Sequence, residues 1–155
     1  MKKLRIYIDT SVVGGCFDDE FSQWSNTLVD NFRKGYFKPI VSDMLADEIS
    51  RAPVKVKDKY KEIIDYGSEE IKTDSAVLKL VQEYLRRKIL DNKFKSDLTH
   101  IALATVHNAD VLVSWNFKHI VQYAKISQFN AVNIEQGYKT ISIYSPREVV
   151  YEKEV

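Results

Sequence analysis

Residues 4–9 of the chain read LRIYID, and this stretch decides the fold that the sequence predicts. Apolar residues at every second position alternate with more polar ones, which is typical of a β-strand, and the strand ends in the acid Asp9. Ligands of parallel sheets bind beyond the carboxyl ends of the strands, so Asp9 is a candidate site residue. A turn former or helix cap is the alternative, since Asp often takes those roles.

Strands alternate with helices outward from this first strand. The sequence predicts strands at residues 4–8, 37–41, 70–72, 111–113 and 140–144. Helices are predicted at residues 22–34, 54–66, 74–88 and 96–108. Three more helices are predicted to begin at Ser42, where the helix ends before Pro53, at about Phe117 and at Pro146. Residues 111–113 are an unbroken apolar run, as expected for a strand buried on both faces. The alternation predicts an α/β fold, a three-layer α/β/α arrangement with a mainly parallel central sheet.

The composition indicates a single domain. The chain has 155 residues, of which 45% are hydrophobic, and we expect a domain over residues 1–150 and a tail over 151–155. With 23 Lys and Arg against 22 Asp and Glu, the chain is not expected to coat nucleic acid by charge alone. The single cysteine allows no internal disulfide, and no segment is long and apolar enough for a signal peptide or a membrane span. A cytoplasmic protein that makes no use of a membrane is expected.

Glu48 is the second candidate acid, because it lies on the apolar face of its predicted helix. Met44, Leu45 and Ile49 share its stripe, whereas Asp47 falls on the polar face. A carboxylate on an apolar stripe is costly unless something pairs with it. An Arg, a Lys or a metal ion is the expected partner, and a structural salt bridge remains the alternative.

Asp97 is the third candidate acid, in the first turn of the helix that Ser96 is expected to cap. Acids are favoured at helix N-termini, which is the simpler explanation of its place. Residues 98–105, however, are nearly all apolar or small, so this helix is expected to lie in the core. Its N-terminus should then reach the same edge of the sheet as Asp9.

Three carboxylates from separate segments therefore converge at one predicted edge. Mg²⁺ and Mn²⁺ prefer oxygen ligands, and a cation relieves the repulsion between clustered carboxylates. We predict that Asp9, Glu48 and Asp97 bind Mg²⁺ or Mn²⁺, which can activate a water and neutralise charge on a phosphate. The sequence has no His-x-x-x-His or Cys-x-x-Cys spacing that would indicate zinc instead.

Four segments, in this order, resemble the PIN-domain family and its VapC-like ribonucleases. They are IDTSV at 8–12, SDMLADE at 42–48, DLTHIALA at 97–104 and DVLVSWN at 110–116. The resemblance covers most of the chain and implies a Mg²⁺- or Mn²⁺-dependent nuclease that acts on RNA.

The same resemblance implies roles for particular residues and for partners. Asp9, Glu48 and Asp97 would be the catalytic, metal-binding acids, and the supporting residues would be Thr10, Ser11, Ser114 and Asn116. Many small members of the family are toxins of type II toxin–antitoxin pairs. The resemblance therefore also implies a homodimer and an antitoxin protein as a partner.

The chain departs from the family pattern at Asn116. The family often carries Thr-x-Asp after this strand, but here the place reads Ser114-Trp115-Asn116, which offers a carbonyl oxygen without a charge. Asp110 is no substitute, because it starts the strand and lies about 15–20 Å from Asn116 by strand rise. A single well-bound metal, or a weakened PIN-like domain that binds RNA or a protein without cleavage, therefore stays open.

A basic stretch leads to Asp97. Arg86, Arg87, Lys93 and Lys95 are tentative RNA-binding residues, because cations near the metal would hold the RNA backbone. The alternative is a solvated helix end whose cations complement the helix dipole.

Several other side chains are expected to have structural roles only. His100 is interpreted as a hydrogen-bonded core histidine and Trp115 as a core residue, although Trp115 could also stack on a base. His107 and His119 have no evident partner. Cys16, in the expected loop after Asp9, has nothing nearby to lower its pKa.

A phosphatase of the haloacid dehalogenase type also begins with a strand that ends in Asp. That family uses Asp-x-Asp, whereas Ser11 stands two residues after Asp9. The general acid is therefore missing, and this alternative ranks low.

Overall fold

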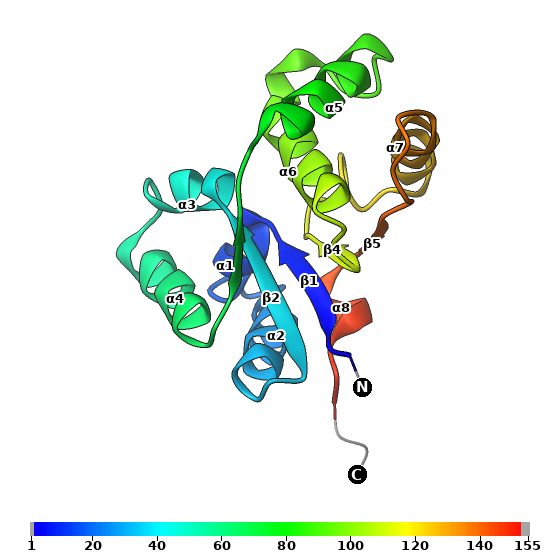
Figure 1. Cartoon of the computed structure of the whole chain (residues 1–155). Coiled ribbons are helices and arrows are strands. Elements are labelled where there is room, and N and C mark those ends of the chain that lie inside the picture. The colour runs from blue at the N-terminus through cyan, green and yellow to red at the C-terminus, as the bar shows by residue number, and fades with distance from the viewer. Residues whose placement is uncertain (1, 153–155) are drawn as a thin grey trace.

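A five-stranded parallel sheet forms the centre of the computed structural model, which describes residues 2–152 (Figure 1). The strands are β1 (Leu4–Ile8), β2 (Phe37–Ser42), β3 (Glu69–Ile71), β4 (Val111–Val113) and β5 (Ser142–Tyr144), in the order β3-β2-β1-β4-β5. Every pairing between neighbours in this sheet is parallel. The predicted α/β fold is confirmed, and β1 lies in the middle of the sheet.

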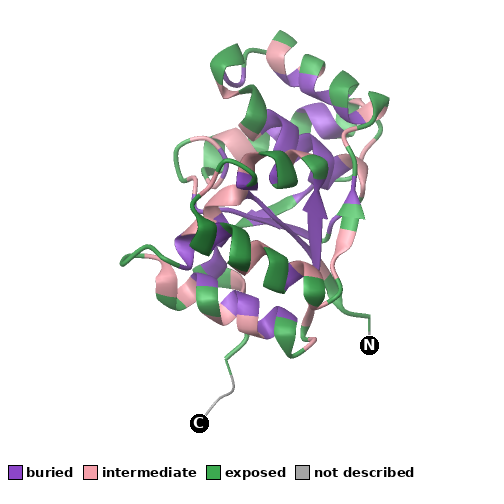
Figure 2. Ribbon diagram, turned by 90° about the vertical axis from the view of Figure 1, so that its left-hand side faces the viewer, coloured by how far each residue is buried: buried purple, intermediate pink, exposed green. Residues whose placement is uncertain are grey.

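Helices cover both faces of the sheet. They are α1 (Thr10–Gly15), α2 (Ser22–Arg33), α3 (Asp43–Ile49), α4 (Val54–Asp65), α5 (Ser75–Arg86), α6 (Lys95–Val106), α7 (Tyr123–Glu135) and α8 (Pro146–Val149), with a 3₁₀ turn, η1, at Asn92–Phe94. Ile6 and Ile8 pack in one hydrophobic core with α1, α2 and α4, whereas Tyr7 packs in a second core with α5, α6 and α7. Figure 2 shows the buried strands between helices whose outer faces are exposed. This is the predicted three-layer arrangement.

The helix ends follow the signals in the sequence. The Ser42 side chain accepts a hydrogen bond from the Leu45 amide and caps α3, and Asp74 caps α5 in the same way. Gly35 and Gly67, which follow α2 and α4, have φ values of +77° and +93°. Glycine is favoured there because other residues rarely adopt the left-handed conformation.

Two helix starts were predicted wrongly. Residues 10–15 form α1 and not a loop, because Asp9 caps a short helix directly after β1. Ser96 does not cap α6, which begins one residue earlier, at Lys95, without a side-chain cap. Asp97 still lies in the first turn of α6, as predicted.

The predicted start of the last long helix at Phe117 is also wrong, because α7 begins at Tyr123. The side-chain oxygen of Asn116 accepts hydrogen bonds from the amides of Lys118 (3.2 Å) and His119 (2.9 Å). These bonds resemble those of a helix N-cap, and the Ile120 amide also donates to the Asn116 carbonyl (3.1 Å), but the turn does not continue into a helix. The segment after β4 therefore stays at the sheet edge.

Tyr151, near the end of the described residues, is hydrogen-bonded to α2. The side chain of Asn31 donates to the carbonyl of Tyr151 (3.0 Å) and accepts from its amide (2.8 Å). Residues 153–155 of the expected tail lie outside the described part. Across residues 2–152, no helix combines the length and the apolar character that crossing a membrane requires.

Gly14 and Gly15 in α1 give a matched pair of substitutions. A Cβ added at Gly15 would lie 2.6 Å from Ser25 Oγ and 2.7 Å from Trp115 Nε1, whereas one at Gly14 meets nothing within 4 Å. We expect Gly15→Ala to lower the free energy of unfolding by roughly 1–3 kcal/mol through overpacking. Gly14→Ala should keep it or raise it by up to about 1 kcal/mol, through helix propensity. Urea denaturation measures both, and equal stability of the two variants would contradict this packing.

Candidate functional site

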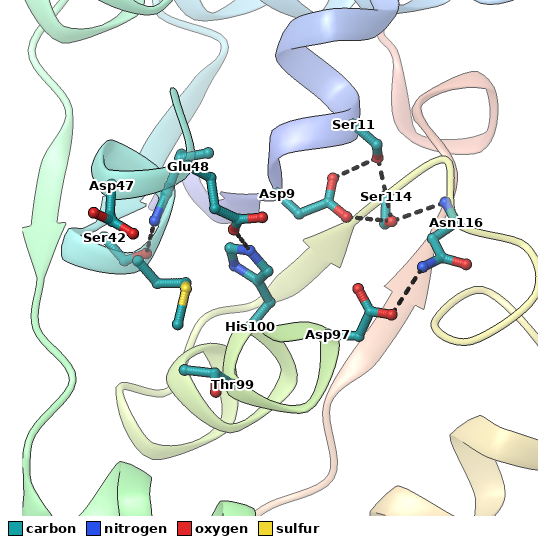
Figure 3. Close-up of polar contacts among 12 residues, drawn as sticks. Asp9, Ser11, Ser42, Asp47, Glu48, Asp97, Thr99, His100, Ser114 and Asn116 are labelled. Atoms are coloured by element: carbon teal, nitrogen blue, oxygen red, sulfur yellow. Dashed lines mark hydrogen bonds and ion pairs between the residues drawn. The ribbon is translucent and has the colours of Figure 1, made fainter. Parts of the chain in front are cut away.

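Asp9 lies directly after β1, and its carboxylate is buried at the carboxyl edge of the sheet (Figure 3). Its Oδ1 accepts hydrogen bonds from Ser11 Oγ (2.6 Å) and the Val12 amide (3.3 Å). Its Oδ2 accepts one from Ser114 Oγ (2.5 Å). The interpretation of Asp9 as a helix cap is therefore confirmed, and the same carboxylate is also tied to the segment after β4.

The hydroxyls of Ser11 and Ser114 connect this carboxylate to the backbone of that segment. Ser11 Oγ accepts a hydrogen bond from the Trp115 amide, and Ser114 Oγ accepts one from the Asn116 amide, both at 2.9 Å. Each hydroxyl thus donates to Asp9 and accepts from the backbone. The orientation of the Asp9 carboxylate is fixed from two sides.

Burial raises the pKa of Asp9 above its ordinary value. The nearby His100 and the hydrogen bonds from Ser11, Ser114 and the Val12 amide oppose this shift without cancelling it. No Lys, Arg or His side chain among residues 2–152 forms an ion pair with Asp9. Its negative charge is therefore held at a cost that a bound cation would relieve.

Asp97, at the start of α6, also contacts the segment after β4. Its Oδ2 accepts a hydrogen bond from Asn116 Nδ2 (3.3 Å) and lies 2.9 Å from His119 Nδ1. The sequence-based view that His119 has no partner is wrong. His119 is reached because the Asn116 turn brings it back toward α6, a contact between segments that no spacing in the sequence announces. Ser114 and Asn116 thus link Asp9 to Asp97 (Figure 3).

Glu48 is held by a separate chain of hydrogen bonds. Its Oε1 is bonded to His100 Nε2, His100 Nδ1 lies 2.6 Å from the Tyr7 hydroxyl, and that hydroxyl lies 2.7 Å from Ser42 Oγ. These contacts join Ser42, Tyr7, His100 and Glu48 in one chain, in which His100 Nε2–H donates to the Glu48 carboxylate. The predicted role of His100 as a hydrogen-bonded core residue is confirmed.

Histidine, and not Arg or Lys, is the protein partner of Glu48. Burial raises the pKa of Glu48, but the hydrogen bond and charge of His100 outweigh that effect, so the pKa lies below its ordinary value. Leu45 and Ile49 on the same helix face are buried, and Asp47 is exposed and paired with Arg51, as the helical spacing predicted.

The three acids reach one edge of the sheet but do not form a closed cluster. Within residues 2–152, no three or more Asp, Glu, His or Cys side chains gather closely enough to hold a metal ion. Asp9 and Asp97 are linked through serine and asparagine, whereas Glu48 turns to His100. Thr10 Oγ1 is buried, and its hydroxyl is close enough to Glu48 to help lower the pKa of that carboxyl, although the contact is too long or bent for a normal hydrogen bond. The donors are the oxygens that a hard cation prefers.

The basic residues before Asp97 are partly engaged with neighbours. Arg86 pairs with Glu83, and Arg87 pairs with Glu135, both at the surface. The ammonium of Lys93 lies 5.1 Å from the ring centre of Phe94, and Lys95 is exposed at the start of α6. Their role in RNA binding stays a prediction.

Two residues singled out in the sequence are part of the core. Trp115 is 7% exposed, which confirms that it packs in the interior. Cys16 is buried, in α1's cap and not in a loop, and burial raises the pKa of its thiol to about 11. It is therefore a protonated thiol at neutral pH.

Two further residues lie away from the site. Asp110 Oδ2 accepts a hydrogen bond from the Arg5 amide (2.8 Å) at the start of β1, which places it at the opposite edge, as predicted. His107 has a partner after all, because its Nε2 lies 3.1 Å from the carbonyl oxygen of Lys72.

The comparisons with known proteins bear on the fold. None of the protein-family models and none of the curated proteins compared with the chain matches it. Among solved structures, the fold is similar to that of a chain in the crystal structure of VapBC2 from Rickettsia felis bound to a DNA fragment from their promoter, with a TM-score of 0.58 and 15% sequence identity. The alignment covers 92% of this chain and 98% of that chain. The likeness shows a common fold.

Tyr7→Phe tests the hydrogen-bond chain that holds Glu48. Loss of the hydroxyl leaves the buried His100 Nδ1 without its hydrogen-bond partner, which should lower the free energy of unfolding by about 1–3 kcal/mol. Tyr84→Phe is the matched control, because the Tyr84 hydroxyl is also buried and donates to Asn133. Both variants should lose similar stability, but only Tyr7→Phe should change the side-chain ¹⁵N NMR signals of His100. Unchanged His100 signals in Tyr7→Phe would contradict the hydrogen-bond chain.

Asp9→Asn tests the cost of the buried charge. Because the pKa of Asp9 is raised above its ordinary value of 3.8, the folded state binds the proton more tightly than the unfolded state. Protonation of Asp9 therefore contributes to the free energy of unfolding at low pH, and this contribution is lost as the pH rises through the raised pKa. In chelator at pH near 7, Asp9→Asn should therefore unfold at a higher temperature than the parent, and this difference should narrow on acidification.

The exposed Asp47→Asn is the control, with little expected effect at either pH. An Asp9→Asn protein that is less stable than the parent at neutral pH would show that the hydrogen bonds to the carboxylate outweigh the cost of its burial.

Proposed function

We propose that the protein hydrolyses phosphodiester bonds in RNA with Mg²⁺ or Mn²⁺ held by Asp9, Glu48 and Asp97. The observation that carries the proposal is the buried Asp9 carboxylate. It has no ion-pair partner in the described part of the chain, and it is linked through Ser114 and Asn116 to Asp97. Buried charge without a cationic side chain is the arrangement that a bound metal stabilises.

The donors at this edge fit a hard cation. Asp9, Glu48 and Asp97 would hold it with carboxylate oxygens, and the buried Thr10 hydroxyl, which follows Asp9 in the chain and lies near Glu48, is a further oxygen. When bound, such a cation lowers the pKa of a water and neutralises charge that develops on a phosphate.

The serines and Asn116 position these acids. Ser11 and Ser114 fix the rotamer of Asp9, and the amide of Asn116 orients Asp97. The carbonyl oxygen of Asn116 already accepts two backbone hydrogen bonds, so Asn116 acts through Asp97 and not as a fourth acid. This supports a site for one cation.

His100 positions Glu48. The imidazole is only 2% exposed and is fixed by the Tyr7 hydroxyl, so it fixes Glu48 Oε1 in turn. Held in this way, the Glu48 carboxylate would contribute to binding the cation. Hydrogen-bonded carboxylates of this kind are held ready for a metal by their outer partners.

The likeness to a chain of the VapBC2 structure supports a finer proposal. The protein would be the toxin of a type II toxin–antitoxin pair, with an antitoxin protein as partner. A homodimer is implied by the family resemblance of the sequence and not by this likeness. Lys93 and Lys95 precede Asp97 and would hold the backbone of the RNA substrate.

A second candidate function has one observation in its favour. Asn116 stands where the family resemblance implies a fourth acid, and its amide occupies Asp97 Oδ2. A weakened domain that binds RNA or a protein partner without cleavage would show this arrangement. Cleavage assays separate the two functions.

The proposed activity predicts a specific pattern of loss. Purified protein should cut an end-labelled RNA pool with Mn²⁺ or Mg²⁺ and not with EDTA. Asp9→Asn, Glu48→Gln and Asp97→Asn should each lower the rate on the order of hundredfold or more, because each removes a proposed ligand. Metal-independent cutting, or an Asp97→Asn protein as fast as the parent, would overturn the proposal.

Two controls match these acids. Asp47→Asn changes the exposed neighbour of Glu48, and Asp110→Asn changes an acid at the opposite edge. Both should keep the parent's rate within about twofold, as expected for surface substitutions away from a site. RNA binding without cleavage by the folded parent protein would favour the second function.

A further inference from the structure

A cavity of about 350 Å³ with an aromatic wall lies next to the acidic site. We call it the aromatic pocket, and its lining consists of four aromatic rings, one serine, one basic residue and two acids: Phe21, Trp24, Trp115, Phe117, Ser145, Arg147, Glu20 and Glu148. Its volume is in the range of cavities that bind small molecules, which is roughly 300–1,000 Å³.

The rings of the pocket differ in how firmly they are held. Phe21 stacks on Trp115 with ring centres 4.1 Å apart and planes at 16°, and Trp115 Nε1 donates to Ser25 Oγ (2.8 Å). Phe117 lies 6.1 Å from Trp115, and half of it is exposed. Phe21 and Trp115 are therefore a fixed floor, whereas Phe117 presents a free ring face.

Arg147 supplies a cation at the rim. Its guanidinium lies 5.3 Å from the ring centre of Trp24, and it belongs to α8, whose first turn is fixed by the capping box of Ser145 and Glu148. Among residues 2–152, no acid forms an ion pair with Arg147. Glu20 and Glu148 line the same pocket without pairing with Arg147, so Arg147 is the basic group of this lining that can attract an anion.

The pocket and the acidic site share one segment of backbone. Trp115 and Phe117 flank Asn116, whose amide donates to Asp97, and consecutive Cα atoms are about 3.8 Å apart. The Trp115 amide also donates to Ser11, which bonds to Asp9. The segment that lines the pocket with Trp115 and Phe117 is therefore the one that also contacts Asp97 and Ser11.

We infer that the aromatic pocket binds one nucleobase of single-stranded RNA, which stacks on Phe117, while Arg147 binds an adjacent phosphate. The inference rests on the proposed RNA-cleaving function and adds a subsite to it. A flat ring with polar edges matches an aromatic wall beside a rim of hydrogen-bonding groups, and a phosphate matches the free guanidinium.

The fluorescence of the two tryptophans can report whether a ligand occupies the pocket. The whole chain contains two Trp residues, and both line this cavity. Titration of the parent protein in EDTA with a short single-stranded RNA should therefore quench tryptophan fluorescence in a saturable way. An RNA of the same length with abasic sites keeps its phosphates, so it should bind more weakly and quench less.

Substitutions in the pocket distinguish the contribution of base stacking to RNA binding from that of phosphate binding. Phe117→Ala should weaken RNA binding on the order of tenfold, as loss of one stacked base does, and Phe117→Tyr should restore it. Arg147→Gln should weaken the binding of intact and abasic RNA alike. Tyr123→Ala is the control, because Tyr123 is 87% exposed on α7 and does not line the pocket.

The outcomes also separate this inference from the proposed function. If Phe117→Ala binds and cuts RNA like the parent, or abasic RNA quenches as fully as intact RNA, the nucleobase subsite is wrong and the nuclease stands. If the folded parent neither binds nor cuts any RNA, both are wrong. Quenching by an antitoxin peptide but not by RNA would identify the pocket as a protein contact and overturn the inference.

Discussion

The hydrogen bonds of the buried Asp9 carboxylate are the interaction on which this edge of the molecule depends. They join the end of β1, the first turn of α1 and the segment after β4, through Ser11, Ser114 and the Val12 amide. β1 is the central strand, so a residue at its carboxyl end is enclosed by neighbours on both sides. Burial makes the charge costly, and three neutral donors only partly offset that cost.

The alternation of side chains along β1 extends this constraint to a second acid. Ile6 and Ile8 fill one core, so Tyr7 must enter the other core, under α6. There its hydroxyl meets His100, which holds Glu48. The strand that ends in Asp9 therefore also orients the carboxylate on α3. The positions of two acids from distant segments follow from one strand.

Much of the fold and part of the site could be predicted from the sequence, because both rest on local periodicity and on the rule for parallel sheets. The stripe that carries Glu48 and the apolar run at 111–113 are such local signals. The contacts of His100 with Glu48 and of His119 with Asp97 could not be predicted, since each joins segments whose distance depends on tertiary packing. The segment after Asn116 was mistaken for the start of a long helix, because Asn116 does cap a turn there, but the turn ends before residue 123.

Calorimetric titration of metal-free protein with Mn²⁺ measures whether Asp9 anchors a cation site. We expect saturable binding of one Mn²⁺ per chain that is lost in Asp9→Asn and kept in Asp110→Asn, whose acid lies at the opposite edge. Equal Mn²⁺ binding by Asp9→Asn and the parent, or no binding by either folded protein, would show that Asp9 anchors no such site.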